Sequence, residues 1–160
     1  MMTHLSCKVI EQLQGKTLVS AESCTGGGIG AALTAVPGSS KVYKGGIISY
    51  TNWVKENLLG VDKTILDTFG AVSEPVAIMM AQGVRLKMEA DIAVSITGLA
   101  GPDGDEFGNP VGTVYIGYAD PNISFARLFH FIGDRDAIRQ QGITAALELV
   151  LEQQNTDEKK

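Results

Sequence analysis

The sequence has 160 residues, of which 44% are apolar and 19% charged, and this predicts one soluble globular domain with a core of its own. The formal net charge of −5, without any lysine and arginine cluster, argues against a nucleic-acid partner, and no apolar run is long enough to cross a membrane. Charged residues among the first apolar ones (His4, Lys8 and Glu11) argue against a signal peptide, so we expect a cytoplasmic protein.

The first part of the chain predicts a helix, a strand and a second helix. Apolar residues recur at helical spacing over residues 3–14, and Lys16–Ala21 is a short, mostly apolar strand. A glycine-rich turn follows. The second helix runs from Ile29 to about Thr34, because Pro37-Gly38 then forms a turn.

The middle of the chain predicts one strand and three helices. Gly46–Tyr50 has the composition of a strand, and a short helix follows over residues 53–58. Asp62–Phe69 is another short helix, which a glycine closes. The third helix begins at Ser73, with a proline in its first turn.

The next part of the chain predicts three strands. Asp91–Thr97 is an almost continuous apolar run, so we expect it to be a central strand. A long loop over Gly98–Pro110 leads to two further strands, Thr113–Ala119 and Phe125–Ile132. The turn at residues 120–122 joins these two strands into a hairpin.

The last helix begins at Asp134 and runs to about Gln153, and we expect the polar tail over residues 153–160 to be frayed. Strands that alternate with helices are typical of an α/β protein. We therefore predict a single three-layer α/β/α domain over residues 1–160. Its five-stranded sheet is mixed and mostly parallel, and the hairpin supplies the antiparallel member.

Four loops carry more small and polar residues than packing requires, namely residues 22–28, 49–55, 97–112 and 133–139. The first three follow strands at their carboxyl ends, and ligands of open α/β sheets bind at that edge. These loops therefore predict a pocket.

The glycine-rich turn is the most informative part of this predicted pocket. It places the hydroxyls of Ser23 and Thr25 beside the amide groups around Gly26 and Gly27, at the start of a helix. A nucleophile next to amide donors suits acyl transfer. The common alternative is a serine that caps the helix. The turn matches neither a Walker motif nor a dinucleotide fingerprint.

A serine nucleophile needs a base, and neither histidine is well placed, since His4 lies in the first helix and His130 within a strand. We expect Lys55 to be the base, with its charged form destabilised by burial or by a cation such as Arg135. Tyr50 would relay a proton or hold the lysine. The alternatives are a solvated lysine on a helix surface and a tyrosine that packs on the sheet.

Cys24 is a rival nucleophile, because a helix start stabilises a thiolate. Neighbouring residues on a turn point in different directions, and Cys24 fits a small buried apolar side chain better. Together with Cys7 it has neither the spacing of a disulfide framework nor that of a metal site. We therefore expect two reduced thiols, no metal and no cofactor.

Two further features suggest substrate binding. Thr97 and Gly98 begin a loop whose hydroxyl and backbone groups can face a ligand. Arg135 lies at the start of the last helix, where an arginine can bind a phosphate. The alternative is a surface ion pair with one of the neighbouring aspartates. Arg139 lies one turn further on and shares the same helix face.

Five motifs, in order and spacing, resemble the CinA C-terminal domain family: Ala21–Gly27, Gly70–Pro75, Gly98–Gly104, Pro110–Val114 and Gly133–Asp136. The resemblance covers nearly the whole chain and implies a three-layer fold with a mixed five-stranded sheet. It also implies a nicotinamide mononucleotide amidohydrolase of the PncC type. That enzyme releases ammonia and nicotinate mononucleotide in bacterial pyridine nucleotide salvage.

The family is thought to use a serine with a lysine, and the resemblance carries this pair onto Ser23 and Lys55, with Tyr50 nearby. It further implies that Thr97 and Arg135 touch a small mononucleotide substrate and that the protein forms a homo-oligomer. Many family members have an additional N-terminal domain linked to nucleotide pyrophosphatase activity. Because this sequence begins at the C-terminal domain, we expect that activity to be absent.

Two other hypotheses remain open. The same loops would serve a regulatory module that binds a nucleotide without turnover, although binding alone needs no pair of Ser23 and Lys55. A cysteine hydrolase that uses Cys24 is the other hypothesis, and it predicts inactivation by iodoacetamide.

Overall fold

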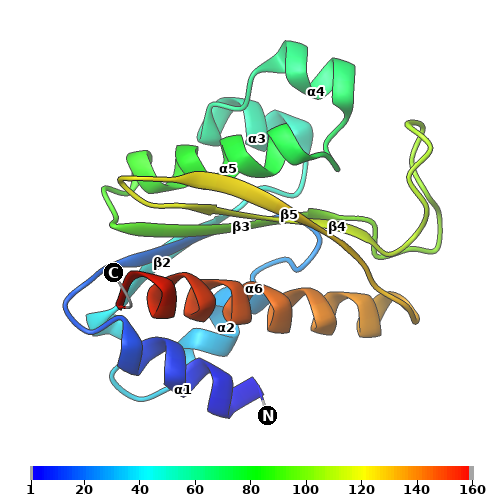
Figure 1. Cartoon of the computed structure of the whole chain (residues 1–160). Coiled ribbons are helices and arrows are strands. Elements are labelled where there is room, and N and C mark those ends of the chain that lie inside the picture. Colours follow the sequence, from blue (N-terminus) through cyan, green and yellow to red (C-terminus); the bar gives the residue numbers. More distant parts are fainter. Residues whose placement is uncertain (1, 159–160) are drawn as a thin grey trace.

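A five-stranded sheet separates two layers of helices in this computed structural model, which describes residues 2–158 (Figure 1). The strands are β1 (Leu18–Glu22), β2 (Tyr43–Ile48), β3 (Ile92–Gly98), β4 (Thr113–Ala119) and β5 (Ser124–His130). Their order across the sheet is β2-β1-β3-β4-β5. β1 is parallel to both neighbours, and β4 is antiparallel to β3 and β5. Only β4 therefore runs against the other four strands, which confirms the predicted mixed sheet.

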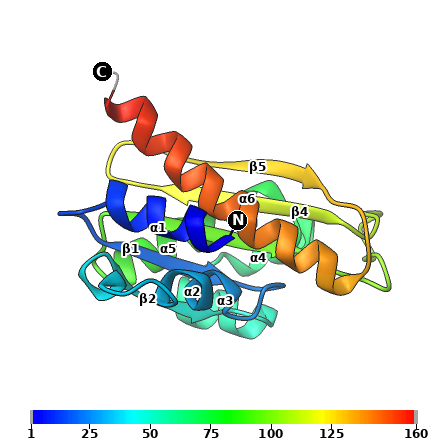
Figure 2. The ribbon, with the colours of Figure 1, turned by 90° about the horizontal axis from the view of Figure 1, so that it is seen from below.

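The helices are α1 (Met2–Gln12), α2 (Gly28–Thr34), α3 (Asn52–Leu59), α4 (Lys63–Phe69), α5 (Glu74–Lys87) and α6 (Arg135–Glu158), with a 3-10 turn at Ser39–Lys41. α3, α4 and α5 cover one face of the sheet (Figure 1). Figure 2, seen from below, shows α1, α2 and α6 across the other face. The predicted three-layer α/β/α arrangement is confirmed.

Each helical layer buries its own apolar cluster against the sheet. Ile29 of α2 and Leu147 of α6 pack in the cluster below the sheet, which includes Ile96 of β3. Met80 of α5 packs above it, in the cluster that contains Ala93. β1 and β3 are buried along almost their whole length, as expected for central strands with helices on both faces.

Local signals set several of the helix boundaries. Asp62 caps α4, because its carboxylate accepts a hydrogen bond of 2.7 Å from the Thr64 amide. Gly70 ends the same helix with a positive φ of 81°, which a glycine adopts without strain. Ser73 directly precedes α5, and Pro75 lies in its first turn, as the sequence predicts.

Some boundaries differ from the prediction. β2 begins at Tyr43 and ends at Ile48, so Ser49 and Tyr50 lie in the loop that follows. The sequence predicts a strand that begins only at Gly46. Gly46 lies so close to β1 that an added Cβ would stand 2.7 Å from the Ser20 carbonyl oxygen. Shifts of one or two residues also occur at α1 and β5.

The C-terminal tail was predicted incorrectly over the described residues, because α6 continues to Glu158. Gln154 is only 3% exposed and ties this part of the helix to the rest of the fold. Its side chain donates a hydrogen bond of 3.1 Å to the Tyr118 hydroxyl and accepts one of 3.3 Å from Lys16. Residues 159 and 160 of the predicted tail lie outside the described residues. Within residues 2–158, no helix has both the length and the apolar character that a bilayer span requires.

Candidate active site

The loops after β1, β2 and β3 meet at one edge of the sheet and enclose a cavity of about 320 Å³. The β3–β4 loop projects beyond the sheet at the same end as the start of α6 (Figure 1). The predicted residues that line the cavity are Ser23, Tyr50, Lys55, Thr97, Gly98 and Arg135. The structure thus brings together residues from four separate segments of the chain, at the strand edge where the sequence predicts a pocket.

Ser23 and Lys55 are in direct contact, although 32 positions separate them in the sequence. The Lys55 ammonium donates a hydrogen bond of 3.0 Å to the Ser23 hydroxyl oxygen and one of 2.7 Å to the Ser49 carbonyl oxygen. Ser23 is 7% exposed and Lys55 is 1% exposed. The alternative of a solvated lysine on a helix surface is therefore wrong.

The first turns of α3 place Lys55 beside the serine. Thr51 precedes the helix, and its hydroxyl accepts a hydrogen bond from the Val54 amide. The amide of Ser49 donates a hydrogen bond of 2.7 Å to the carbonyl oxygen of Glu22, which holds the start of the β2–α3 loop against the end of β1. This backbone contact brings the segments that carry Ser23 and Lys55 to the same edge of the sheet.

Burial lowers the pKa of Lys55 from 10.5 to about 8. The ion pairs of the described residues involve other side chains, so no carboxylate offsets this loss of hydration. Of the two causes that the sequence suggested, burial operates and the Arg135 charge does not. An amine with this pKa has a neutral fraction near physiological pH, and its lone pair can then accept the Ser23 proton.

Cys24 also borders the cavity, but its thiol is not poised for reaction. Burial raises the pKa of the Cys24 thiol to about 11. The thiolate is therefore scarce at neutral pH, which argues against a cysteine nucleophile. Cys24 fits the alternative of a small buried apolar side chain.

The start of α2 differs from the prediction, because the protein's own Glu22 carboxylate occupies it. One Glu22 oxygen accepts hydrogen bonds from the Thr25 hydroxyl (2.6 Å) and the Ile29 amide (2.8 Å), and the other accepts one from the Gly30 amide (3.0 Å). These helix amides are therefore not available to a ligand. This role of Glu22 was not predicted from the sequence. An acidic residue that ends an apolar strand immediately before a glycine-rich turn was the signal for it.

Thr25, Gly26 and Gly27 shape the turn and do not line the cavity. The Gly26 amide donates a hydrogen bond of 3.1 Å to the Ser23 carbonyl oxygen, and Gly27 precedes α2 with a φ of 106°. The expectation that the amides from Thr25 to Gly27 all face a ligand is therefore wrong for Gly26. Among the described residues, the amides of Cys24 and Thr25 donate to no protein acceptor.

Thr97 and Gly98 form part of the cavity wall. The Thr97 hydroxyl donates a hydrogen bond of 2.9 Å to the carbonyl oxygen of Ala71, so it joins β3 to the turn before α5. This differs from the expectation that the hydroxyl faces a ligand as a donor. Gly98 lies so close to β4 that an added Cβ would stand 2.6 Å from the side chain of Val114.

Arg135 and Tyr50 meet at the rim of the cavity. The Arg135 guanidinium donates hydrogen bonds to the Gly101 carbonyl oxygen and, at 3.1 Å, to the Tyr50 hydroxyl. Tyr50 is 58% exposed, and the Ser49 carbonyl rather than Tyr50 holds Lys55. The two expected roles of Tyr50, relaying a proton and holding the lysine, are therefore not supported. The alternative of a surface ion pair for Arg135 is also wrong within residues 2–158.

Arg139 has a different role from Arg135, although they lie one turn apart on α6. Its guanidinium donates hydrogen bonds of 3.1 Å to the Cys24 carbonyl oxygen and 3.2 Å to the Thr25 carbonyl oxygen. Arg139 therefore holds the backbone of the turn that carries the serine, and Arg135 remains at the rim.

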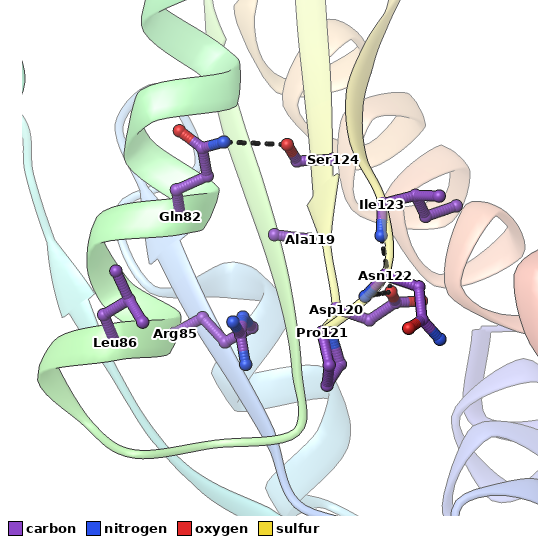
Figure 3. Close-up of a pocket in the computed structure, with 9 residues that line it drawn as sticks. All are labelled: Gln82, Arg85, Leu86, Ala119, Asp120, Pro121, Asn122, Ile123 and Ser124. Carbon is purple, nitrogen blue, oxygen red and sulfur yellow. Dashed lines mark hydrogen bonds between the residues drawn. The ribbon is translucent and has the colours of Figure 1, made fainter.

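A second hollow, of about 450 Å³, lies near the opposite end of the sheet between α5 and the β4–β5 turn (Figure 3). Gln82 donates a hydrogen bond across it to Ser124, and the Arg85 guanidinium donates one to the Ala90 carbonyl oxygen. It is larger than the first cavity, but its lining has no nucleophile paired with a base. Among the described residues, no three His, Cys, Asp or Glu side chains are grouped to hold a metal ion.

Comparison with known proteins gives one consistent family. The family described as CinA C-terminal domain matches residues 2–154. A CinA-like protein of Gloeothece citriformis is 53% identical over 136 residues, which are 83% of this chain and 33% of that protein. A CinA-like protein of Acaryochloris marina is 46% identical over 153 residues, which are 94% of this chain and 36% of that protein. The chain thus spans about a third of the length of these curated relatives.

Solved structures agree with this match. A competence-damaged protein (CinA) superfamily protein from Klebsiella pneumoniae has a TM-score of 0.94 at 33% identity, covering 98% of this chain and 99% of that one. The competence/damage inducible protein CihA from Agrobacterium tumefaciens has a TM-score of 0.91 at 37% identity and covers 94% of each chain. The similarity extends over the whole three-layer fold, including the elements that carry the cavity.

Proposed function

Since the chain belongs to the CinA C-terminal domain family, we propose that it hydrolyses the carboxamide of nicotinamide mononucleotide to nicotinate mononucleotide and ammonia. Ser23 is the nucleophile and Lys55 is the general base. The observation that carries this proposal is the 3.0 Å contact between the two side chains, in which the lysine is buried and has a pKa of about 8. The substrate itself is suggested by the family resemblance.

In the first step, neutral Lys55 takes the Ser23 proton while the hydroxyl oxygen attacks the amide carbon. The new C–O bond converts the carbonyl oxygen into an oxyanion. We assign the amide of Cys24 as a donor to it, because this amide has no protein acceptor, directly follows the nucleophile and belongs to a residue that lines the cavity. The Gly26 amide is already used within the turn.

In the second step, the Lys55 ammonium returns its proton to the departing nitrogen, the C–N bond breaks, and ammonia leaves an ester on Ser23. In the last step, water attacks the carbonyl carbon of this ester while neutral Lys55 takes a proton from the water. The C–O bond to Ser23 then breaks, and Lys55 returns the proton to the departing Ser23 oxygen. The Ser49 carbonyl, which accepts from the lysine at 2.7 Å, keeps the amine aimed at the serine through these steps.

The phosphate of the substrate has one well-placed cation at the cavity, Arg135. Its present partners are a carbonyl oxygen and a hydroxyl, both neutral, so a phosphate can replace them with a charge-assisted contact. The glycine-rich turn is not the phosphate site, because Glu22 already fills the start of α2. Tyr50 would then help to orient Arg135.

The test is a Ser23→Ala variant assayed for ammonia release from nicotinamide mononucleotide. We expect the rate to fall at least about 10³-fold, while calorimetry still detects binding of the mononucleotide. Ser39→Ala is a matched control, because Ser39 has the same 7% exposure but lies in the 3-10 turn away from the cavity. Full activity of Ser23→Ala would remove the covalent mechanism.

The same assay separates this proposal from a regulatory module that only binds a nucleotide. Such a module would bind the mononucleotide without releasing ammonia, in the wild type as in the variant. Burying a lysine without a carboxylate partner costs free energy. A module that only binds a nucleotide gains nothing from burying a lysine against a serine. This favours the hydrolase.

We also propose that the protein works in the bacterial cytoplasm and as a homo-oligomer. Cys7 and Cys24 are both unpaired, which suits a reducing compartment. Tyr50 at the cavity rim and Trp53 in the first turn of α3 are more than half exposed and offer an apolar contact. Light scattering after gel filtration tests the oligomer, and a monomeric mass at micromolar concentration would contradict it.

A further inference from the structure

Glu22 is a buried acid that the proposed chemistry does not use. It is 2% exposed, and both carboxylate oxygens are occupied. Three hydrogen bonds of 2.6–3.0 Å come from the Thr25 hydroxyl and from the amides of Ile29 and Gly30, and a longer one of 3.5 Å comes from Ser20. A buried carboxylate is stable only with such compensation, which the positive end of α2 also supplies.

These bonds close a loop around the nucleophile. Glu22 ends β1, Ser23 follows it, and the carboxylate then reaches forward to the hydroxyl at Thr25 and to the first turn of α2. A helix is ordinarily capped by the residue next to it, and a short polar side chain is enough for that purpose. Here the capping side chain belongs to Glu22, the last residue of β1. Its hydrogen bonds to α2 therefore fix the distance between the end of the strand and the start of the helix.

The main chain of the same residue holds the other half of the pair. The Glu22 carbonyl oxygen accepts hydrogen bonds from the Ser49 amide at 2.7 Å and from the Ser49 hydroxyl at 3.4 Å. The Ser49 carbonyl oxygen in turn accepts from Lys55 at 2.7 Å. One residue thus connects the turn that carries Ser23 with the loop that orients Lys55.

We propose that Glu22 is a positioning residue, which keeps the Ser23 hydroxyl and the neighbouring amides in line with Lys55. This inference rests on the proposed serine–lysine function. Glu22 does not line the cavity and touches neither the serine hydroxyl nor the lysine amine. It acts through the turn, and its loss lowers the rate of bond formation at Ser23 without changing substrate affinity or the titration of the base.

The test compares Glu22→Gln with the wild type in two assays. The first measures labelling of Ser23 by a small fluorophosphonate, in which the serine oxygen forms a bond to phosphorus, fluoride leaves, and Lys55 takes the proton. The second measures kcat and KM for ammonia release from nicotinamide mononucleotide. Glutamine keeps the size of the side chain, but its NH2 group faces donors where an oxygen stood.

We expect both the labelling rate and kcat of Glu22→Gln to fall about 30- to 100-fold, because a small misplacement of reacting groups has that effect. KM stays within about threefold, and the pH midpoint of labelling stays at the wild-type value. Asp62→Asn is the matched control, since it makes the same acid-to-amide change at the start of α4, away from the cavity. Its rates stay within about twofold of the wild type.

Two results would overturn the proposal: unchanged labelling and kcat in Glu22→Gln, or a pH midpoint that moves by about one unit, which would mean that Glu22 acts on the charge of Lys55. Should Glu22→Gln not fold, Thr25→Val and Thr25→Ser provide the same comparison. Valine removes one donor to the carboxylate and serine keeps it, so labelling falls about tenfold further in the valine variant than in the serine variant. Equal rates in these two variants would also overturn the proposal.

The labelling assay keeps this inference separate from the proposed function. Wild-type protein that is labelled at Ser23 but releases no ammonia would contradict the proposed substrate. The comparison between Glu22→Gln and the wild type would still decide the role of Glu22. A wild-type protein that is not labelled at Ser23 would overturn the nucleophile and the positioning role together.

Discussion

The burial of Lys55 predicts how the proposed hydrolysis depends on pH. With a pKa of about 8, about one lysine in ten is neutral at pH 7 and about half at pH 8. A lysine with the ordinary pKa of 10.5 would have a neutral fraction of about 0.03% at pH 7, which is about 300-fold smaller. Burial alone therefore supplies a factor of about 300 in the concentration of the active base.

The assay is kcat/KM for ammonia release from nicotinamide mononucleotide between pH 6 and pH 10. We expect the value to rise about tenfold per pH unit up to about pH 8 and then to level off. Lys55→Arg keeps a cation but cannot release its proton in this range, so activity falls at least about 10³-fold at every pH. Lys55→Met keeps the approximate length of the side chain but has neither an amine nor a charge. It shows whether the loss in Lys55→Arg comes from the missing base or from the retained positive charge.

Two outcomes would refute this reasoning. One is a wild-type profile that is flat from pH 6 to pH 9. The other is a Lys55→Arg variant that keeps both measurable activity and the rise near pH 8. Either result would mean that another group takes the proton from Ser23.

Three further variants and one titration test other parts of the structure. Relative to Lys55→Met, the wild type should gain up to about 3 kcal/mol in its free energy of unfolding between pH 8 and pH 10.5, because the unfolded chain still holds the Lys55 proton that the folded chain has released. The buried Cys24 thiol, with its pKa of about 11, lowers the stability of both proteins over this range and cancels in the comparison. The same pH dependence of both proteins in urea titrations would contradict the assignment. Arg135→Met should raise KM for nicotinamide mononucleotide about 10- to 100-fold but change KM for the riboside without phosphate less than about threefold; equal effects on both substrates would exclude a phosphate contact. Cys24→Ala should keep its rate within about threefold, and iodoacetamide should leave the wild type active at pH 7, because the buried thiol has a pKa of about 11; rapid inactivation would restore the cysteine hypothesis. Gly83→Ala should lower the free energy of unfolding by at least about 3 kcal/mol, because its Cβ would lie 1.9 Å from the Leu59 carbonyl oxygen; a denaturation midpoint like that of the wild type would contradict the packing of α3 on α5.

Local patterns were sufficient to predict the layers, the strands and the central pair of residues. The almost continuous apolar run over residues 91–97 identified a central strand, observed as β3, because a strand between two helical layers is apolar on both faces. The placement of the two histidines argued against a histidine triad and directed attention to Lys55, since a serine nucleophile needs some base. The apolar character of a strand and the absence of a nearby histidine depend only on residue types and their order, which the sequence contains.

The partners of individual side chains depended on the tertiary structure. Arg135 and Arg139 share one helix face in the sequence pattern, but Arg135 lies at the cavity rim and Arg139 binds the Cys24 and Thr25 carbonyls. The start of α2 is a second example. The sequence predicts that its amides bind a ligand, but in the structure the Glu22 carboxylate accepts their hydrogen bonds.

The sequence by itself thus determined the candidate residues for chemistry and the edge of the sheet at which they lie. Only the tertiary structure decided that Lys55 is buried, that it touches Ser23, and that its pKa falls to about 8. The physical reason is that hydration and distance between residues 32 positions apart depend on the packing of the whole fold. The loss of water that activates the amine therefore arises only once α3 and the strand-end loops have come together.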